Sequence, residues 1–401
     1  MVINEGSATP INPIKEMKPL SLSVTFAVTL SLLLACKQKP SIEVREIDFV
    51  NKAETTMHGV PVNAQMPLSV HGMIHCDSLN IVVAEDPKGY VHVYSDSWQL
   101  LDVFSGKGRA RNEFLTSPSM NRKQIFKGSD GHILLPLFDW RADVVKLMDI
   151  TESLKEHRAI IADVREYGNE EENRIIDNVE KTETRLMSSF DALFLDDNLY
   201  HTLEITYADF YEILKKPVEY RIRHDSIFIE KPEVLYRMEQ LVGPEYKNQF
   251  SRTAYRHPKR NLIIETFTNL DYIAFLDLDN NRSFFIHQAG SATYDNKVEI
   301  GKYVEDGIVY ARPERICFTN AIPTDDFFIV SYYGPFIDNA PASPELMFFD
   351  WDGNFIKSVK QDILTKYSVF DPKTKTLYGI RMPDDEEEQL ISFDLSAIID
   401  R

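Results

Sequence analysis

The chain has 401 residues, 43% of them hydrophobic, and 62 acidic side chains against 44 lysines and arginines give a formal net charge of −18. This charge argues against a nucleic-acid-binding protein, because phosphate contacts need clustered lysine and arginine side chains. Only three cysteines are present, which excludes a fold held together by a framework of disulfides.

The N-terminal segment has the pattern of a secretory signal. An apolar run from Leu20 to Ala35 follows the basic residues Lys15 and Lys18, and Met17 is an alternative start of the chain. The run is shorter than the roughly 20 apolar residues that a membrane-spanning helix needs, and serines and threonines interrupt it. We therefore predict a cleaved signal and no transmembrane helix.

The run ends in Leu33-Leu34-Ala35-Cys36, which resembles a bacterial lipobox, although Leu34 is larger than the usual residue at its position. The resemblance implies cleavage before the cysteine and attachment of lipid chains to its thiol. More than one chain suffices for stable anchoring. We predict a signal peptide over 1–35, a lipidated cysteine with a short tether over 36–40, and one domain over 41–401.

The residues after Cys36 bear on the side of the membrane. Lys37-Gln38-Lys39 lacks the acidic residues that follow the cysteine in the surface lipoproteins it resembles. We predict an envelope protein that faces the periplasm, with exposure at the cell surface as the alternative.

From residue 41 onward a turn followed by a strand-like apolar run recurs six times. The turns contain Asp77, Asp130, Asp196, Pro258, Asp325 and Asp371, and the strands behind them are 79–83, 133–135, 199–200, 262–264, 327–330 and 377–380. Further strands are predicted at 91–94, 144–148, 210–213, 272–276, 346–349 and 390–393, with fourth strands at 283–287 and 354–359. Asp350-Trp351-Asp352-Gly353-Asn354 is a hairpin turn in which glycine supplies the positive φ.

Repeats of four short strands are typical of β-propeller blades, because each blade buries its faces only against its neighbours. We therefore predict an all-β, six-bladed propeller with four-stranded blades. The last repeat ends after its third strand at Asp394, and residues 42–49 alternate between apolar and polar side chains as a strand does. We expect this N-terminal strand to close the last blade and remove two open sheet edges.

The chain resembles the TolB-like six-bladed propeller lipoproteins of Bacteroidetes-type bacteria. The lipobox, the repeats and the segment from Gly106-Lys107-Gly108 to Glu113-Phe114 carry the resemblance, although residues 110–112 depart from the usual glycine and proline spacing. The resemblance implies the architecture and the location, and it supplies no catalytic residues.

Several motifs that suggest chemistry are incomplete. Gly106 and Gly108 lack the rest of a nucleotide-binding loop, and His71 and His75 lack the glutamate of a zinc-protease helix. The turn at Asp130 lacks the further acidic ligand of a calcium loop. We therefore predict no catalytic residue, no metal ligand and no cofactor.

Two further cysteines lie in the predicted domain. Cys76 and Cys317 fit two buried thiols, with one disulfide between them as the alternative.

In a four-stranded blade, the loops between the second and third strands share one face with the connections between blades. Trp140, Arg141, Tyr333 and Arg315 are predicted there, on three different blades. Aromatic and arginine side chains suit recognition of a glycan or a peptide. The alternative is that these loops are simply polar and their aromatics cap the core.

These observations favour a non-enzymatic propeller, tethered to a membrane, that binds or scaffolds a protein or glycan partner. The alternative is a calcium-dependent propeller hydrolase of the lactonase or esterase type. That class needs carboxylates from several blades around a central ion, so tight calcium binding would distinguish it.

Overall fold

The computed structural model describes residues 43–120, 124–128, 130–139, 141–142, 144–166, 191–194, 199–204, 219–224, 227–230, 252–268, 270–277, 279–280, 282–290, 301–305, 308–312, 315–335, 344–381 and 388–399. The segment Glu43–Arg401 forms one compact unit. The predicted signal peptide, Cys36 and its tether lie outside the described residues.

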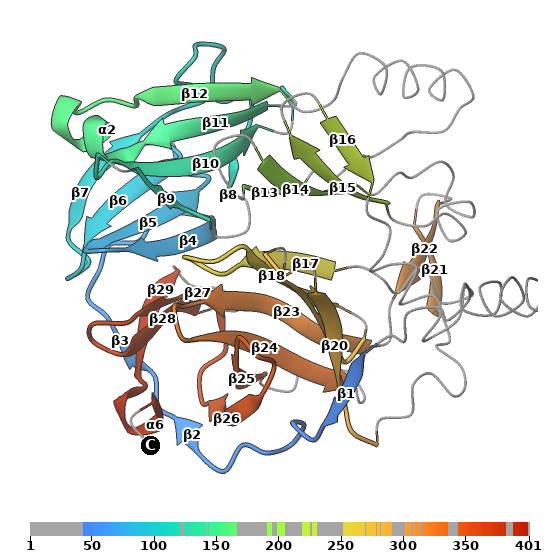
Figure 1. Cartoon of the computed structure of the whole chain (residues 1–401). Coiled ribbons are helices and arrows are strands. Elements are labelled where there is room, and N and C mark those ends of the chain that lie inside the picture. Colours follow the sequence, from blue (N-terminus) through green and yellow to red (C-terminus); the bar gives the residue numbers. More distant parts are fainter. Residues whose placement is uncertain are drawn as a thin grey trace, which may run out of the picture. The chain divides into compact units, whose positions relative to one another are not determined.

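Apart from the ribbon of β21 (Gly301–Glu305) and β22 (Ile308–Arg312), the described strands form six sheets of four or five strands (Figure 1). Sheet 1 contains β4 (Val70–Cys76), β5 (Leu79–Ala84), β6 (Val91–Ser95) and β7 (Leu100–Phe104). Sheet 2 contains β8 (Ser119–Met120), β9 (Phe126–Lys127), β10 (Ile133–Asp139), β11 (Val144–Asp149) and β12 (Ile161–Glu166). Sheet 3 contains β13 (Asp191–Phe194), β14 (Leu199–Glu204), β15 (Glu219–His224) and β16 (Ile227–Glu230).

The remaining sheets each include one strand from the N-terminal segment. Sheet 4 contains β17 (Arg252–Arg256), β18 (Leu262–Phe267), β19 (Tyr272–Asp277), β20 (Arg282–Gln288) and β1 (Val44–Ile47). Sheet 5 contains β23 (Arg315–Pro323), β24 (Phe327–Pro335), β25 (Glu345–Asp350), β26 (Phe355–Gln361) and β2 (Thr56–Met57). Sheet 6 contains β27 (Thr365–Asp371), β28 (Thr376–Arg381), β29 (Gln389–Asp394) and β3 (Val60–Pro61).

The sheets pack radially through their first strands. β13 contacts β17, β17 contacts β23, β23 contacts β27, β27 contacts β4, and β4 contacts β8. Antiparallel sheets that follow one another around a common centre in this way form a β-propeller. The predicted all-β propeller fold is confirmed.

Apolar clusters fill the spaces between successive sheets. One cluster joins sheets 1 and 2, another joins sheets 4 and 5, and a third joins sheets 5 and 6. A fourth cluster contains Met73 and Val82 of sheet 1 together with Val369 and Ile380 of sheet 6. β5, β10 and β18 are consequently buried along almost their whole length, which explains why they appear in the sequence as continuous apolar runs.

The predicted strands agree with the structure in most repeats. β5, β10, β14, β18, β24 and β28 contain the six predicted post-turn strands. In sheet 3 the strand that pairs with β14 is β15, whereas the predicted strand at 210–213 lies outside the described residues.

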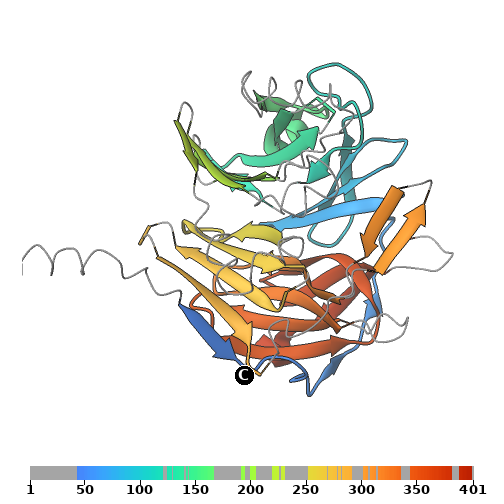
Figure 2. The ribbon, with the colours of Figure 1, turned by 90° about the vertical axis from the view of Figure 1, so that its right-hand side faces the viewer.

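The prediction that residues 42–49 close the last sheet is wrong. β1 pairs in parallel with β20 of sheet 4, and β3 instead completes sheet 6 by antiparallel pairing with β29. β2 lies between them in sequence and pairs in parallel with β26 of sheet 5. Residues 43–62 therefore run along the edges of three successive sheets, and we call this segment the N-terminal strap. Figure 2 shows its blue strands beside the yellow-to-red sheets.

Packing explains why the strap begins on sheet 4. The Phe49 side chain is fully buried between sheets 4 and 5, with its ring 5.5 Å from that of Phe349 and 6.1 Å from that of Phe318. Gln288 at the end of β20 accepts hydrogen bonds from the backbone N–H groups of Phe49 and Val50, both at 2.8 Å. If the first strand of the strap lay at the edge of sheet 6 instead, the Phe49 side chain would not fill the space between the aromatic residues of sheets 4 and 5.

The described helices are short: α2 (Ile150–Glu156) and α6 (Ser396–Ile399). Among the residues that the structure describes, no helix has the length and apolar content needed to cross a membrane.

Candidate ligand-binding cavity

The four residues predicted to form a binding face are only partly described. Trp140 lies outside the described residues, and Arg141 is exposed at the turn after β10. Arg315 begins β23 and Tyr333 is a half-buried residue of β24, so both belong to sheet 5 rather than to different blades. Burial raises the pKa of Tyr333, and a hydrogen bond with Thr319 opposes that shift. The convergence of these residues on one ligand stays a prediction.

A different region of the described chain contains a hollow. In each sheet a turn joins the first strand to the second, and we call that end of the sheet the turn end. A cavity of about 830 Å³ lies there, lined by residues 73–77, 124–127, 256–259, 322–327, 368–370, 372–373, 375 and 399. Arg141 and Tyr333 lie at the opposite ends of their sheets.

Five sheets contribute to this cavity, because the first strands of a propeller converge on its centre. Ile74, Ile125, Phe126, Ile322 and Phe370 supply apolar surface to the lining, and charged and polar side chains make up the rest of it. A concave hollow that combines apolar surface with polar and charged groups can hold a small molecule.

Charged side chains at the rim join neighbouring sheets. Lys127 of sheet 2 forms an ion pair with Asp77 of sheet 1 at 2.6 Å, and Lys259 of sheet 4 does so with Asp325 of sheet 5 at 2.5 Å. Hydrogen bonds to these carboxylates raise the pKa values of both lysines. Lys373 of sheet 6 donates to the Asp77 carbonyl oxygen at 2.8 Å. These contacts link sheet 1 with sheet 2, sheet 4 with sheet 5 and sheet 6 with sheet 1 at the cavity mouth.

His257 stabilises one of the turns that line the cavity. Its Nδ1 accepts hydrogen bonds from the backbone N–H groups of Lys259 and Arg260 at 2.9 and 3.2 Å, and its ring lies 4.6 Å from that of Trp351. Burial, with Arg260 nearby, lowers the pKa of His257 to about 4. The neutral ring is needed because a protonated Nδ1 could not accept these bonds.

The most unusual polar group in the lining is His75. Its side chain is 7% exposed, and its Nδ1 lies 2.9 Å from Asn80 Oδ1. Its Nε2 is buried without a hydrogen-bond partner and lies 3.6 Å from Oδ1 of Asp371, whose side chain is 5% exposed. Buried polar groups are nearly always paired, and the carboxylate of Asp371 is the group that faces this nitrogen.

The two cysteines of the domain are free thiols and are not joined to each other, so the alternative of a disulfide between them is wrong. Cys317 is buried, whereas Cys76 is partly exposed and lines the cavity. Burial, followed by the charge of Asp77, raises the pKa of Cys76 to about 11. The group is therefore a thiol rather than a nucleophilic thiolate at neutral pH.

His71 and His75 do not share a site. His71 Nε2 lies 3.0 Å from the Pro118 carbonyl oxygen and from Ser117 Oγ, away from the Asn80 contact of His75. In the described ranges, no group of three or more His, Cys, Asp or Glu side chains could hold a metal ion.

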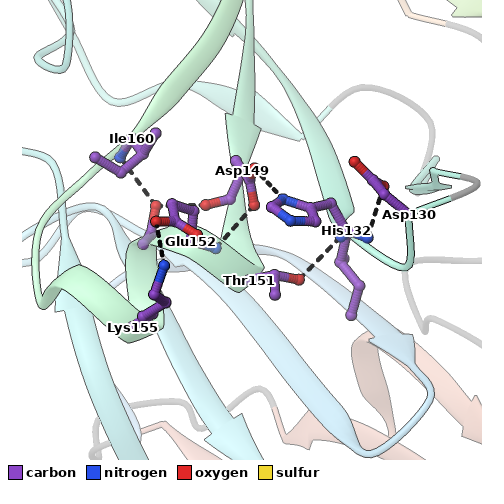
Figure 3. Close-up of polar contacts among 9 residues, drawn as sticks. Asp130, His132, Asp149, Thr151, Glu152, Lys155 and Ile160 are labelled. Atoms are coloured by element: carbon purple, nitrogen blue, oxygen red, sulfur yellow. Dashed lines mark hydrogen bonds and ion pairs between the residues drawn. The ribbon is translucent and has the colours of Figure 1, made fainter.

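The polar cluster around Asp149 has a structural role (Figure 3). Asp149 caps α2 by accepting the backbone N–H of Glu152 at 2.9 Å, and its other oxygen lies 2.6 Å from His132 Nδ1. The hydrogen bond to Asp149 raises the pKa of His132. Ser153 Oγ donates to the Asp149 carbonyl oxygen and accepts from Ile160 N, so its hydroxyl is occupied by the backbone.

The segment that carries the family resemblance is a loop anchored between sheets 1 and 2. Phe114 is fully buried and its backbone exchanges hydrogen bonds with Gly106 and Gly108. Glu113 Oε2 accepts the backbone N–H of Ala110 at 2.9 Å, and Lys146 Nζ lies 4.7 Å from the Phe114 ring centre. Gly106 and Gly108 therefore have a structural role, which is to close this loop onto Phe114.

Sequence reasoning assigned the cavity residues to ordinary turns. The signal that could have found them is the recurrence of charged residues at equivalent turns, such as Asp77, Lys259, Asp325 and Lys373. His75 stands out in the sequence only through its spacing from His71, whereas its contact with Asp371 depends on sheet 6.

No protein-family model and no curated protein matches the sequence. Among solved structures, the chain is similar to a member of the DUF4221 family from Bacteroides vulgatus, at 10% identity over 86% of this chain and 98% of the other, with a TM-score of 0.49. It is also similar to a Bacteroides fragilis protein provisionally described as exported, at 9% identity over 88% and 99%, with a TM-score of 0.46. A calcium-binding protein, regucalcin from Agrobacterium tumefaciens, matches at 9% identity over 84% and 95%, with a TM-score of 0.43. At these values the propeller assignment rests on the sheet topology.

Proposed function

We propose that this protein is a lipid-anchored, periplasm-facing envelope protein whose propeller binds a small ligand in the turn-end cavity without transforming it. The lipobox ending at Cys36 and the preceding apolar run support the anchor and the location. A protein or glycan partner at the opposite end, near Arg141 and Tyr333, stays a prediction.

The cavity is the observation that carries this proposal. Its volume of about 830 Å³ falls within the range of roughly 300–1,000 Å³ that is usual for ligand sites. Its walls come from five sheets that buried apolar clusters pack together, so the site is preformed and binding requires little ordering.

The occupied polar groups favour binding over catalysis. His257 Nδ1 is engaged by the backbone, Cys76 is protonated at neutral pH, and Asp77 and Asp325 hold rim lysines. No observation in the described part of the chain favours the calcium-dependent hydrolase. If calcium raised the melting temperature strongly and a chelator reversed the effect, the hydrolase would become the better assignment.

We also propose that the propeller is a six-bladed, TolB-like ring in which sheet 3 is the blade between sheets 2 and 4. The contact between β13 and β17 supports this placement. The contacts between sheets 6 and 1 support ring closure, since Glu388 accepts the backbone N–H of Val70 at 2.7 Å and the Trp98 and Tyr378 rings lie 5.1 Å apart.

Native mass spectrometry tests the binding function. Mature protein isolated from its own membranes in mild detergent should carry a small molecule that denaturation releases. Ile125→Trp, which places an indole at the cavity wall, should lose it. Ile356→Trp is the matched control, because Ile356 is 46% exposed on β26 and does not line the cavity. Protein without a released molecule, or equal occupancy in Ile125→Trp, would argue against ligand binding in this cavity.

A further inference from the structure

We infer that the ligand of the turn-end cavity is a small carboxylate with an apolar body, and that its carboxylate group binds the ammonium groups of Lys127 and Lys373. This inference rests on the proposed function, since it names the chemistry of the ligand in the same cavity. The observation behind it is the arrangement of these two lysines, which both contact Asp77 at the cavity mouth.

The lining of the cavity differs in charge from the protein as a whole, which has a formal net charge of −18. Its lysines and arginines outnumber its acidic residues: they are Lys127, Arg256, Lys259, Lys373 and Lys375, against Asp77, Asp325 and Asp326. Exposed charges more than about 8 Å away are largely screened at physiological ionic strength, so the lining outweighs the distant acidic surface. A cleft with an excess of cationic groups in its walls concentrates anions.

The excess of positive charge is clearest at Asp77, where three sheets meet. Lys127 of sheet 2 pairs with the Asp77 carboxylate at 2.6 Å, and Lys373 of sheet 6 donates to the Asp77 carbonyl oxygen at 2.8 Å. Within the described ranges Lys373 forms no ion pair, and the nearby Asp371 does not line the cavity, because its carboxylate faces His75. Two ammonium groups therefore share one carboxylate, which leaves one positive charge in excess.

Both lysines are accessible to a ligand. The Lys127 side chain is 56% exposed, Lys373 is exposed as well, and both line a cavity of about 830 Å³. Each ammonium group has three hydrogens and makes one hydrogen bond among the described residues. Each can therefore donate a further hydrogen bond to a molecule at the cavity mouth without losing its contact with Asp77.

A carboxylate matches these two ammonium groups better than other head groups do. It has two oxygens that only accept, so it can take a hydrogen from each lysine in a charge-assisted bond. Its single negative charge equals the excess of positive charge at Asp77. A phosphate monoester carries roughly two negative charges at neutral pH and would leave one of them unbalanced. An uncharged amide would gain the hydrogen bonds but not the charge attraction.

Apolar side chains in the lining define the rest of the ligand. Ile74, Ile125, Phe126 and Phe370 lie in the wall of the cavity, and Phe126 precedes Lys127 in β9. An apolar body attached to the carboxylate would bury its surface against these side chains, which is favourable because that surface leaves water. The ligand class is therefore a small monocarboxylate with an aliphatic or aromatic body.

Three probes with one aromatic body and different head groups test the inference on the mature protein in mild detergent at pH 7.5. These are 3-phenylpropanoate, 3-phenylpropanamide and 2-phenylethyl phosphate. Calorimetric titration should show that the carboxylate binds at least tenfold more tightly than the amide and more tightly than the phosphate ester. Raising sodium chloride from about 50 to about 500 mM should weaken binding of the carboxylate but not of the amide, because salt screens the charge attraction.

Two variants connect the preference for the carboxylate to the proposed groups. Lys127→Gln and Lys373→Gln each keep an N–H donor and remove the charge, so each should reduce the preference over the amide to less than threefold. Lys155→Gln is the matched control, because Lys155 is an exposed lysine that pairs with Glu152 at 2.8 Å and does not line the cavity. It should leave the preference unchanged.

Asp77→Asn should change the affinity in the opposite direction. Asparagine keeps an accepting oxygen for Lys127 and tolerates the positive φ of 57° at this position, but it removes the negative charge that competes with the ligand. The variant should therefore bind 3-phenylpropanoate at least threefold more tightly than the natural protein. A purely structural role of the two lysines would not produce this gain.

Equal binding of the carboxylate and the amide, or a preference that survives in both lysine variants, would overturn the inference while leaving cavity binding intact. Weaker binding of the carboxylate by Asp77→Asn, tighter binding of the phosphate ester, or absence of binding by all three probes would also overturn it. The native mass experiment judges the proposed function separately: a released ligand that is not a carboxylate sustains the function without the inference.

Discussion

His287 Nδ1 lies 2.9 Å from a carboxylate oxygen of Glu46, a residue 241 positions earlier in the chain. The other ring nitrogen lies 3.4 Å from Oδ1 of Asp271, and the imidazole stacks on Tyr272 at 4.2 Å. This contact fastens the first strand of the N-terminal strap to sheet 4. Burial lowers the pKa of His287, but hydrogen bonds to Asp271 and Glu46 outweigh that effect, so the pKa is raised.

The His287 contact should make stability depend on pH. Because its folded pKa is raised, its contribution is fully present below the unfolded value of about 6.5 and is lost as the pH rises through the folded pKa. The free energy of unfolding, measured with urea at pH 5.5 and 8.5, should therefore change less with pH in His287→Phe than in the natural protein. An identical pH dependence in both proteins would contradict this role. Glu46→Gln, which keeps a hydrogen-bond acceptor, should retain part of the effect.

His257 should produce the opposite pH dependence. Its pKa in the folded protein is lowered to about 4. On acidification, the unfolded chain therefore takes up a proton on this histidine near pH 6.5, whereas the folded chain does so only near pH 4. Its stabilising contribution should fall as the pH drops below about 6.5 and stop changing below about 4. Thermal melts at pH 7.5, 5.5 and 4.5 should show a smaller acid shift in His257→Asn than in the natural protein, since asparagine accepts hydrogen bonds without titrating in this range. Equal changes of melting temperature in the two proteins would show that protonation of His257 does not affect stability.

Phe49→Ala should be strongly destabilising. The ring is fully buried among aromatic side chains of sheet 5, and removing such a ring typically costs about 3–5 kcal/mol. Val60→Ala in the same strap is the control, because Val60 is 60% exposed and should change the free energy of unfolding by less than about 0.5 kcal/mol. Similar values for the two variants would mean that the strap is not anchored at Phe49.

Stepwise removal of the strap should separate the contribution of β1, at the edge of sheet 4, from that of β2 and β3, at the edges of sheets 5 and 6. A chain starting at Asn51 loses β1 and exposes the edge of β20, so it should fold with a lower melting temperature. A chain starting at Asn63 also loses β2 and β3 and uncovers β26 and β29, so it should be poorly soluble. If the shorter deletion were already as harmful as the longer one, β2 and β3 would add little to the stability that β1 and Phe49 provide.

Cys36→Ala tests the anchor. The thiol is the proposed lipid acceptor, so the variant should stop incorporating labelled fatty acid and accumulate as an uncleaved precursor. Fatty-acid labelling and the apparent mass on gels measure both effects. A variant that matures normally and still takes up label would show that the lipobox assignment is wrong.

The sequence was sufficient for the repeated strands. Runs such as 79–83 and 327–330 are apolar, rich in β-branched or aromatic residues, and preceded by Asp or Pro turns, which is a local signal. Asp350 illustrates how local it is: its Oδ1 accepts the backbone N–H groups of Asp352 and Asn354 within the same turn. These interactions span a few residues, so they can be predicted without knowledge of the fold.

The sequence by itself therefore determined the all-β class and most strand positions, since periodicity and turn chemistry are properties of neighbouring residues. Only the tertiary structure decided which sheet each N-terminal strand joins, because edge pairing depends on remote partners such as Phe349 for Phe49 and His287 for Glu46. It also decided where the cavity lies. His75 and Asp371 are ordinary residues in the sequence, and they lie 3.6 Å apart only because radial packing brings sheet 1 against sheet 6.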